Sequence, residues 1–107
     1  MKRTVFISGP MTGIRHYNYP AFDAAEIKLK KLGYRVLNPA SIGRKYGMER
    51  EYSFYIGEAM KMLVDADAVV FLKNWGFSQG AKIEMAAATI LNKEILHLTV
   101  IKPLAKN

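Results

Sequence analysis

Short apolar runs alternate along this chain with longer segments that are apolar on one side only. Thr4 to Ile7 is β-branched and aromatic and stops at Gly9-Pro10, which predicts a buried strand. Ala68 to Leu72 is an uninterrupted apolar run, typical of a strand covered on both faces in a parallel sheet. Tyr34 to Leu37 and Ile95 to Leu98 bring the number of predicted strands to four.

Three segments between these strands have helical spacing. The first has a proline, Pro20, at its first position and ends before Gly33, which favours a helix with defined ends. Its apolar positions recur every three or four residues and predict one buried face: Phe22, Ala25, Leu29 and Leu32. Tyr52 to Val64 and Ala81 to Leu91 are helical by the same criterion.

The order of these elements predicts the fold class. Strands that alternate with helices favour an α/β domain with a doubly wound, flavodoxin- or Rossmann-like parallel sheet and helices on both faces. We expect four or five strands in the order 2-1-3-4(-5), where the optional fifth is an edge strand around Val100-Ile101 that Pro103 limits. Ala40 to Glu51 contains two glycines and several charges and is interpreted as a long loop. We expect residues 1–107 to form a single domain.

Composition excludes several classes of site. The chain has no cysteine, and its two histidines, His16 and His97, are far apart in sequence, so no metal or other cofactor is expected. The apolar stretch after the basic N-terminus is too short for a signal peptide or a membrane span, so we expect a cytoplasmic protein. The net charge of +7 is compatible with phosphorylated small molecules, an anionic surface, nucleic acid or simply a solvated basic face. Patterns typical of nucleic-acid binding are absent from the sequence, which makes that partner the less expected one.

The strand order predicts where a ligand binds. In open parallel sheets ligands lie beyond the carboxyl ends of the strands, at the point where the strand order reverses. The two loops expected there, Ser8 to Gly13 and Lys73 to Gly80, are also rich in glycine and hydroxyl residues. Ser78 has two possible roles, as the cap of the following helix or as a phosphate contact. The simpler alternative is that both loops are merely tight turns.

Among the nine acidic residues, Glu84 alone is expected near this point on a regular element. It lies a little over one turn into the third helix, with Ile83, Met85 and Ala86 around it. We expect partial burial, with the helix N-terminus favouring the ionised form, as suits a nucleophile. A solvated helix glutamate is the alternative.

Three sequence blocks in order resemble the nucleoside 2-deoxyribosyltransferase-like superfamily, especially its short phage and bacterial members. The blocks are Phe6 to Gly13, Tyr17 to Phe22 and Trp75 to Glu84, and the resemblance covers nearly the whole chain. Its most specific part is the Ser-x-Gly-Ala-x-x-Glu pattern from Ser78 to Glu84.

The resemblance implies chemistry at the N-glycosidic bond of deoxynucleosides or their 5′-monophosphates. It implies that Glu84 attacks the anomeric carbon, that a covalent deoxyribosyl-enzyme forms, and that water or another base resolves it. It also implies a small-molecule nucleoside or nucleotide as the partner and a homo-oligomer in which a neighbour often completes the pocket. The expected substrate-binding residues are Phe6, Ser8, Gly9, Pro10, Met11, Thr12, Gly13, Asn38, Trp75, Ser78, Gly80 and Ala81.

The chain departs from the family pattern at two positions. Ala59 stands where the family usually has an aspartate that helps to protonate the leaving base, and Phe6 stands where transferases have a tyrosine near the nucleophile. Glu58 and Tyr55 are the candidate replacements for the missing acid. A module that binds a nucleotide without turnover is therefore the alternative function.

Two further features allow more than one interpretation. Arg44, Lys45 and Arg50 form either a lid over an anionic ligand or, together with the lysine-rich first helix, a nucleic-acid surface. Trp75 either stacks on a base or packs beneath its own loop.

Overall fold

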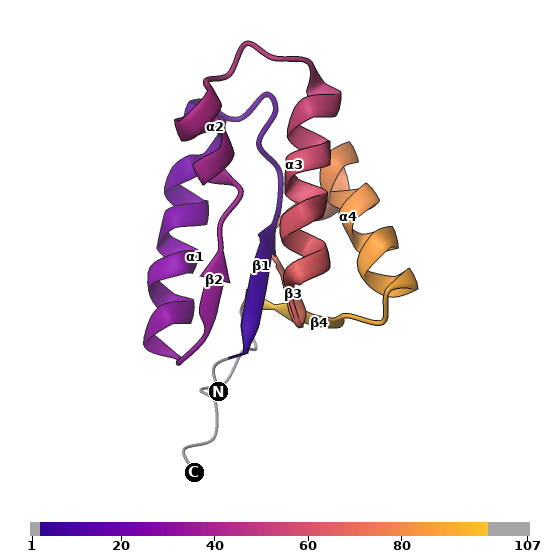
Figure 1. Cartoon of the computed structure of the whole chain (residues 1–107). Coiled ribbons are helices and arrows are strands. Elements are labelled where there is room, and N and C mark those ends of the chain that lie inside the picture. The colour runs from indigo at the N-terminus through magenta and orange to yellow at the C-terminus, as the bar shows by residue number, and fades with distance from the viewer. Residues whose placement is uncertain (1–2, 99–107) are drawn as a thin grey trace.

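A computed structural model of the chain describes residues 3–98 and shows four parallel strands with helices between them (Figure 1). The strand order is β2-β1-β3-β4, as the sequence predicts. Central strand β1 pairs with β2 through Phe6 opposite Leu37, and with β3 through Ser8 opposite Phe71. The strands are β1 (Thr4–Ser8), β2 (Arg35–Leu37), β3 (Ala68–Phe71) and β4 (Glu94–His97).

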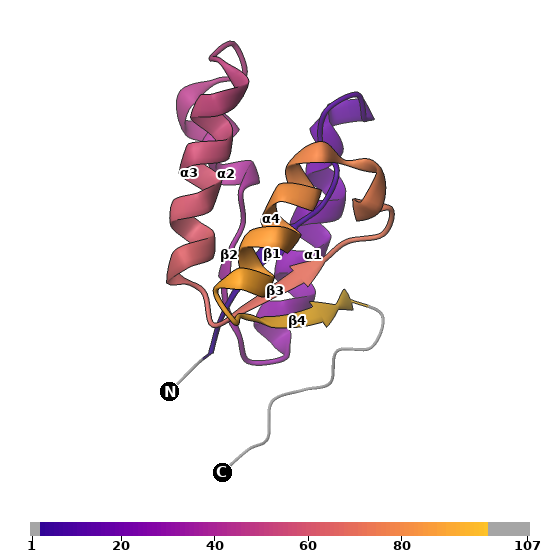
Figure 2. The same ribbon diagram turned by 90° about the vertical axis from the view of Figure 1, so that its right-hand side faces the viewer.

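The helices cover both faces of the sheet. The α-helices are α1 (Tyr19–Lys31), α2 (Ala40–Tyr46), α3 (Tyr52–Asp65) and α4 (Gln79–Ile90), and the short 3-10 turns are η1 (Arg15–Asn18) and η2 (Trp75–Phe77). One apolar core joins α1 to the side chains of Val5, Ile7 and Val70. The other joins α3 and α4 to the opposite face through Phe6, Val69 and Phe71. Figure 2 shows α1 and α3 on opposite sides of the strands.

The first helix confirms the predicted apolar face. Phe22, Ala25 and Leu29 are buried, and Leu32, just beyond the last helical residue, packs against the same core. Pro20 lies in the first turn, where a missing backbone N–H breaks no intrahelical hydrogen bond. This helix therefore forms where the sequence places it.

The predicted long loop from Ala40 to Glu51 is wrong in its first half, which is helix α2. The turn begins because the side chain of Asn38 accepts a hydrogen bond from the backbone N–H of Ala40 at 2.9 Å. Ala40 and Ile42 are then buried against the two cores, and this tertiary contact outweighs the low helix propensity of glycine. The expected edge strand around Val100-Ile101 lies outside the described residues.

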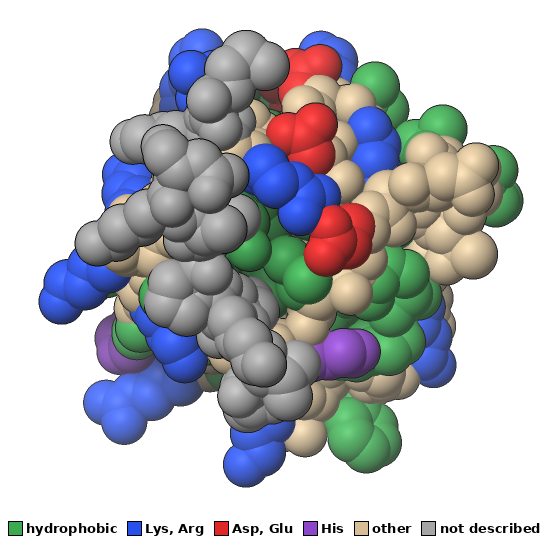
Figure 3. Space-filling model, turned by 90° about the horizontal axis from the view of Figure 1, so that it is seen from below, with side chains coloured by type: hydrophobic (Ala, Val, Ile, Leu, Met, Phe, Trp, Pro, Cys, Tyr) green, Lys and Arg blue, Asp and Glu red, His purple; other side chains and the backbone are tan. Residues whose placement is uncertain are grey.

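The amino edge of the sheet, seen from below in Figure 3, holds acidic and basic side chains in contact with one another and with backbone. Arg3 pairs with Glu94 at 2.5 Å, and Asp67 accepts a hydrogen bond from the backbone N–H of Thr4 at 2.9 Å. These carboxylates serve the structure of that edge. Within residues 3–98, no helix is both long and apolar enough to cross a lipid bilayer.

Candidate active site

A cavity of about 300 Å³ lies at the carboxyl edge of the sheet, where strand order reverses between β1 and β3. Its size is at the lower end of the range typical of small-molecule sites. The loop after β1, the connection from α2 to α3, and the first turns of α3 and α4 all contribute to its wall. The lining residues are Gly9, Met11, Thr12, Tyr17, Tyr19, Phe22, Pro39, Ile42, Gly43, Met48, Arg50, Tyr52, Tyr55, Ile56, Ala59, Ser78, Gly80, Ala81 and Glu84.

Glu84 is a buried carboxylate on the wall of this cavity, with an exposed fraction of 7%. Ser8, at the end of β1 and itself fully buried, donates a hydrogen bond from Oγ to Oε1 of Glu84 at 2.5 Å. Burial raises the pKa of Glu84 to about 7, and the hydrogen bond from Ser8 opposes that rise. The sequence predicted that the helix N-terminus would favour the ionised form, but burial outweighs it. The carboxylate is thus poised to change charge near neutral pH.

Gly9 allows the loops after β1 and β3 to meet. A Cβ atom at Gly9 would lie 2.9 Å from the Cβ of Leu72, closer than side chains approach. The backbone N–H of Leu72 donates to the carbonyl oxygen of Ser8 at 2.9 Å, which holds the two strand ends together beside Glu84. A side chain at Gly9 would push these ends apart.

The rest of the first glycine-rich loop divides between the cavity and the opposite face. Met11 and Thr12 line the cavity, whereas Gly13 does not and has a left-handed φ of +79°. Pro10 borders a separate hollow against α1, and its carbonyl oxygen accepts a hydrogen bond from the Asn18 side chain at 2.9 Å.

A left-handed turn follows this loop and brings two tyrosines to the cavity. His16, Tyr17 and Asn18 have φ values of 54°, 54° and 61°, a conformation that costs L-residues free energy. Tyr17 and Tyr19 both line the cavity, with ring centroids 6.0 Å apart.

At the start of α4, Ser78 has the role of helix cap, one of the two considered for it from the sequence. Its Oγ accepts a hydrogen bond from the backbone N–H of Ala81 at 3.2 Å, so Ser78 caps the helix, and both residues also line the cavity. Gly80 leaves room for Tyr52 here, because a Cβ atom would lie 2.7 Å from the hydroxyl oxygen of Tyr52 and would displace that ring. The missing side chain lets that hydroxyl reach the helix.

Besides Ser8, Pro10 and Gly13, four of the expected site residues do not line the cavity. Phe6 is fully buried in the core, and Glu58 pairs with Lys61 at 2.6 Å. Trp75 packs on the ring of Phe71, with centroids 5.0 Å apart, as the alternative interpretation holds.

Asn38, the fourth, joins α1 to the start of α2. Its amide donates to Asp23 at 3.1 Å and to Glu26 at 2.9 Å, and its oxygen accepts from the backbone N–H of Ala40. Its polar atoms are therefore occupied in support of the fold.

The position of the missing family aspartate, Ala59, is a buried part of the cavity wall. Tyr55, one turn earlier, donates its hydroxyl to the carbonyl oxygen of Gly47 at 2.6 Å and accepts from the backbone N–H of Arg50 at 3.0 Å. Tyr55 therefore fastens the connection between α2 and α3. The hydroxyl proton of Tyr55 is already donated to a backbone carbonyl oxygen.

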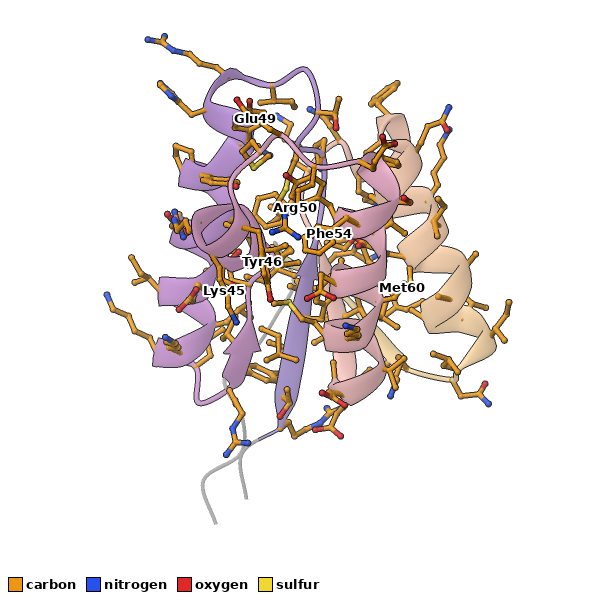
Figure 4. The ribbon with its side chains drawn as sticks, turned by 45° about the horizontal axis from the view of Figure 1, so that its top comes forward. Lys45, Tyr46, Glu49, Arg50, Phe54 and Met60 are labelled. Carbon is orange, nitrogen blue, oxygen red and sulfur yellow. The ribbon has the colours of Figure 1, made fainter. Side chains whose placement is uncertain are left out.

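The arginines of α2 and of the connection after it are held by neighbouring side chains. Arg44 forms two hydrogen bonds to Asp23, at 3.0 and 2.5 Å. Arg50 lies between Tyr46 of α2 and Phe54 of α3, with its guanidinium carbon 5.0 and 4.6 Å from the two ring centroids (Figure 4). Arg50 is also the one cationic residue among those lining the cavity.

Tyr52, Tyr17, Tyr19 and Met48 line the cavity without having been named as binding residues from the sequence, whereas Arg50 was considered there as part of a lid. Tyr17 and Tyr19 belong to the second block of the family resemblance, so that block carried the signal for them. Tyr52, Met48 and Arg50 reach the cavity only through the packing of α2 against α3. Within residues 3–98, no group of three potential metal ligands comes together.

The fold is that of the nucleoside 2-deoxyribosyltransferases. The structure is similar to that of the 2-deoxyribosyltransferase of the psychrotolerant bacterium Bacillus psychrosaccharolyticus, which is described as a biocatalyst for nucleoside synthesis. The TM-score is 0.68 at 19% sequence identity, over 88% of this chain and 70% of the other. The superfamily resemblance seen in the sequence is thereby confirmed at the level of the fold.

By sequence, residues 3–97 match the family described as "Domain of unknown function (DUF4406)". The chain belongs to this family. No curated protein matches it.

Proposed function

We propose that this protein acts on the N-glycosidic bond of deoxynucleosides or their 5′-monophosphates, with Glu84 as the nucleophile. The observation that carries the proposal is the buried Glu84 carboxylate, bonded by Ser8, on the wall of a cavity at the switch point of the sheet. The similarity in fold to a 2-deoxyribosyltransferase supports the same class of substrate.

The reaction begins with the ionised carboxylate. Ser8 donates to Oε1 and leaves Oε2 of Glu84 to attack C1′ of the sugar. As the new C–O bond forms, the C1′–N bond breaks and its electron pair leaves with the base. Water, or a second base, then attacks C1′ and releases the Glu84 carboxylate.

The departing base needs a proton, and Tyr52 is the residue that we assign to supply it. Gly80 and Glu84 lie four residues apart on α4, hence on one face of the helix, and side chains on a helix lean toward its N-terminus. The Glu84 side chain therefore extends toward the place that Gly80 leaves for the Tyr52 hydroxyl. When water resolves the intermediate, its proton returns to the tyrosinate, so the step balances.

The state of the Tyr52 hydroxyl suits this role. Partial burial, and then the negative charge of Glu84, raise the pKa of Tyr52, a half-exposed residue, so that the hydroxyl keeps its proton at neutral pH. Tyr55 is engaged with Gly47 and Arg50, and Ala59 has no proton to give. Tyr52 thus supplies a proton donor in a chain that has Ala59 in place of the family's aspartate and Phe6 in place of the transferases' tyrosine.

Release of free base tests the proposal. The chain is incubated with each deoxynucleoside and each 5′-monophosphate, and the products are separated by liquid chromatography. We expect free base from the wild type and none from Glu84→Ala. Glu58→Ala is the matched control, since that glutamate lies outside the cavity, and it should retain activity. Equal activity of Glu84→Ala and the wild type would refute Glu84 as the nucleophile.

The alternative function, a binding module without turnover, is favoured by Ala59 and Phe6. A saturating ligand raises the melting temperature whether or not products form, because it binds only the folded state. Thermal shift with the same compounds separates the two functions. A clear shift without released base over several hours would select the binding module.

A further inference from the structure

Arg50 differs from the other polar residues of the cavity in having its hydrogen-bond donors free. Of the described residues that line the cavity, Arg50 alone carries a positive charge. Within residues 3–98 its guanidinium forms no ion pair with a carboxylate, and its one hydrogen bond is made by the backbone N–H. The rings of Tyr46 and Phe54 hold the guanidinium through its charge, which leaves its N–H groups available to a ligand.

Arg50 and the start of α4 lie at different ends of the cavity. The hydroxyl of Tyr52 reaches toward the first turn of α4. Phe54 follows two residues later, which turns its side chain by about 200° around the axis of α3. The guanidinium carbon of Arg50 lies on the Phe54 side, 4.6 Å from that ring centroid and 5.0 Å from that of Tyr46 in α2 (Figure 4). Arg50 therefore belongs to the α2 end of the cavity, and Tyr52 to the α4 end with Glu84.

The position of the reacting atoms decides which part of a substrate extends toward Arg50. This step rests on the proposed function, in which Glu84 attacks C1′ and Tyr52 gives a proton to the departing base. The sugar then lies at the α4 end, where the backbone N–H groups of the first helical turn favour an anionic 5′ group. The base is bonded to C1′ and extends away from this end. Its edge opposite to the glycosidic bond therefore points toward Arg50.

The chemistry of the guanidinium determines which base edge fits there. Arginine has N–H donors and no acceptor, so it binds a carbonyl oxygen at that edge, as in 6-oxopurines and 4-oxopyrimidines. An amino group at the same position, as in adenine and cytosine, is itself a donor and leaves both groups without a partner. Proteins that recognise guanine commonly use the same pairing of arginine with the oxygen on the base edge.

The surroundings of Arg50 offer little to a base with an amino group. Glu84 is the one acidic residue among the described residues that line the cavity, and Ser8 binds it at the α4 end. Tyr55 uses its hydroxyl both to donate to a backbone carbonyl oxygen and to accept from a backbone N–H. The hydroxyl of Tyr19 donates to the sulfur of Met48 at 3.1 Å. No carboxylate of the described cavity wall is thus placed to accept from an amino group at the α2 end.

We propose that this protein selects substrates whose base carries an oxo group on the edge opposite to the glycosidic bond, and that Arg50 is the residue that recognises this group. The two pairs of compounds that test the preference differ at that edge. One pair is the 5′-monophosphates of deoxyinosine and deoxyadenosine, and the other is those of deoxyuridine and deoxycytidine.

Equilibrium binding measures the preference separately from turnover. Isothermal titration with Glu84→Gln, which lacks the nucleophile and leaves the ligands intact, gives Kd for each compound. Arginine contacts to a base edge discriminate by at least about fivefold, and Arg50 is exposed, so we take this lower bound. In each pair that binds, the oxo compound should bind at least about fivefold more tightly than the amino compound.

A second substitution identifies the residue responsible. Arg50→Met, added to Glu84→Gln, keeps an unbranched apolar stem between the two rings and removes the donors, so the preference should fall below about twofold. Lys45→Met is the matched control. Lys45 also lies over the ring of Tyr46, at 5.2 Å, but does not line the cavity, and its variant should keep the preference.

Three results would overturn the proposal. Equal binding within both pairs, or a preference that survives Arg50→Met, would refute the role of Arg50 and leave the N-glycosidic function standing. The four nucleosides without phosphate are titrated in parallel. If Arg50→Met weakens the monophosphates but not the nucleosides, Arg50 binds the phosphate and its assignment to the base is wrong. If none of these compounds binds, the proposed function fails together with this inference.

Discussion

The wall and the roof of the cavity are built in different ways. The wall around Glu84 and Ser8 consists of the end of β1 and the first turns of α4, elements that are fixed by the sheet and its cores. The roof is the connection from α2 to α3, which Tyr55 fastens at Gly47 and Arg50. The wall holds the buried carboxylate of Glu84, and the roof holds the guanidinium of Arg50 between the rings of Tyr46 and Phe54 at the adjoining helix ends. The carboxylate thus lies on elements held by the sheet, and the guanidinium lies on a segment held by the hydrogen bonds of Tyr55.

The largest effect on activity is expected from a substitution at Tyr52. This residue begins α3, directly after the connection that forms the roof, and lines the cavity beside the wall. Tyr52→Phe removes only the hydroxyl, and we expect kcat to fall about a hundred-fold, as for loss of a general acid. Activated substrates whose leaving group needs no proton should lose much less, and assays with a natural base and a nitrophenyl-type leaving group compare the two. Tyr17→Phe, on another part of the cavity wall, is the control. Equal losses for both leaving groups would exclude the role of proton donor.

Burial of the Glu84 carboxylate should make the stability of the protein depend on pH. The pKa of Glu84 is raised to about 7 in the folded state, so between its ordinary value near 4.5 and 7 the folded state binds more protons than the unfolded state. The contribution of Glu84 to the free energy of unfolding therefore falls as the pH rises through that window. Glu84→Gln should stabilise the protein at pH 8 by up to about 3 kcal/mol, and should have little effect at pH 4.

Chemical denaturation at the two pH values measures that difference. A stabilisation that is the same at pH 4 and pH 8 would show that Glu84 is not held at a raised pKa.

The next effect isolates the hydrogen bond of Ser8. Ser8→Ala removes a donor to the ionised carboxylate, which should raise the pKa of Glu84 further by about one unit. Activity that depends on the ionised form should then fall about fivefold at pH 7 and recover at pH 9. The pH dependence of kcat/KM tests this. A loss that is independent of pH would mean that Ser8 acts on packing rather than on ionisation.

The smallest effect is expected in the roof. Tyr55→Phe loses the bonds to Gly47 and Arg50, each worth about 1 kcal/mol, so the connection between α2 and α3 should loosen. We expect KM to rise about fivefold with kcat nearly unchanged, and steady-state kinetics with a saturable substrate give both values. A fall in kcat like that of Tyr52→Phe would instead place Tyr55 in the chemistry.

Wall and roof also differ in how far the sequence predicts them. Glu84 could be found because strand order and helix register fix its position, and Ser8 follows from the end of the same β1 run. The strength of the burial of Glu84 could not be predicted from the sequence. It depends on tertiary contacts such as the one with Ser8, which lies 76 residues away along the chain. Ala40 to Tyr46 appeared to be loop because its glycine is a poor helix former, although Gly43 is required by the hydroxyl of Tyr19.

The same limit explains why Asn38 and Trp75 were included among the expected binding residues. Each has a side chain able to bind a ligand, and each is occupied by a neighbour that sequence spacing does not reveal, Asp23 and Glu26 for one and Phe71 for the other.

Mass spectrometry of the quenched reaction tests the role of Glu84 most directly. The wild type is mixed with a deoxynucleoside or its 5′-monophosphate, stopped with acid within one turnover, digested and mapped. We expect a deoxyribosyl ester on the peptide that contains Glu84, absent from Glu84→Gln. Base release from a wild type that never carries this ester, or an ester found on another residue, would contradict the nucleophilic role of Glu84.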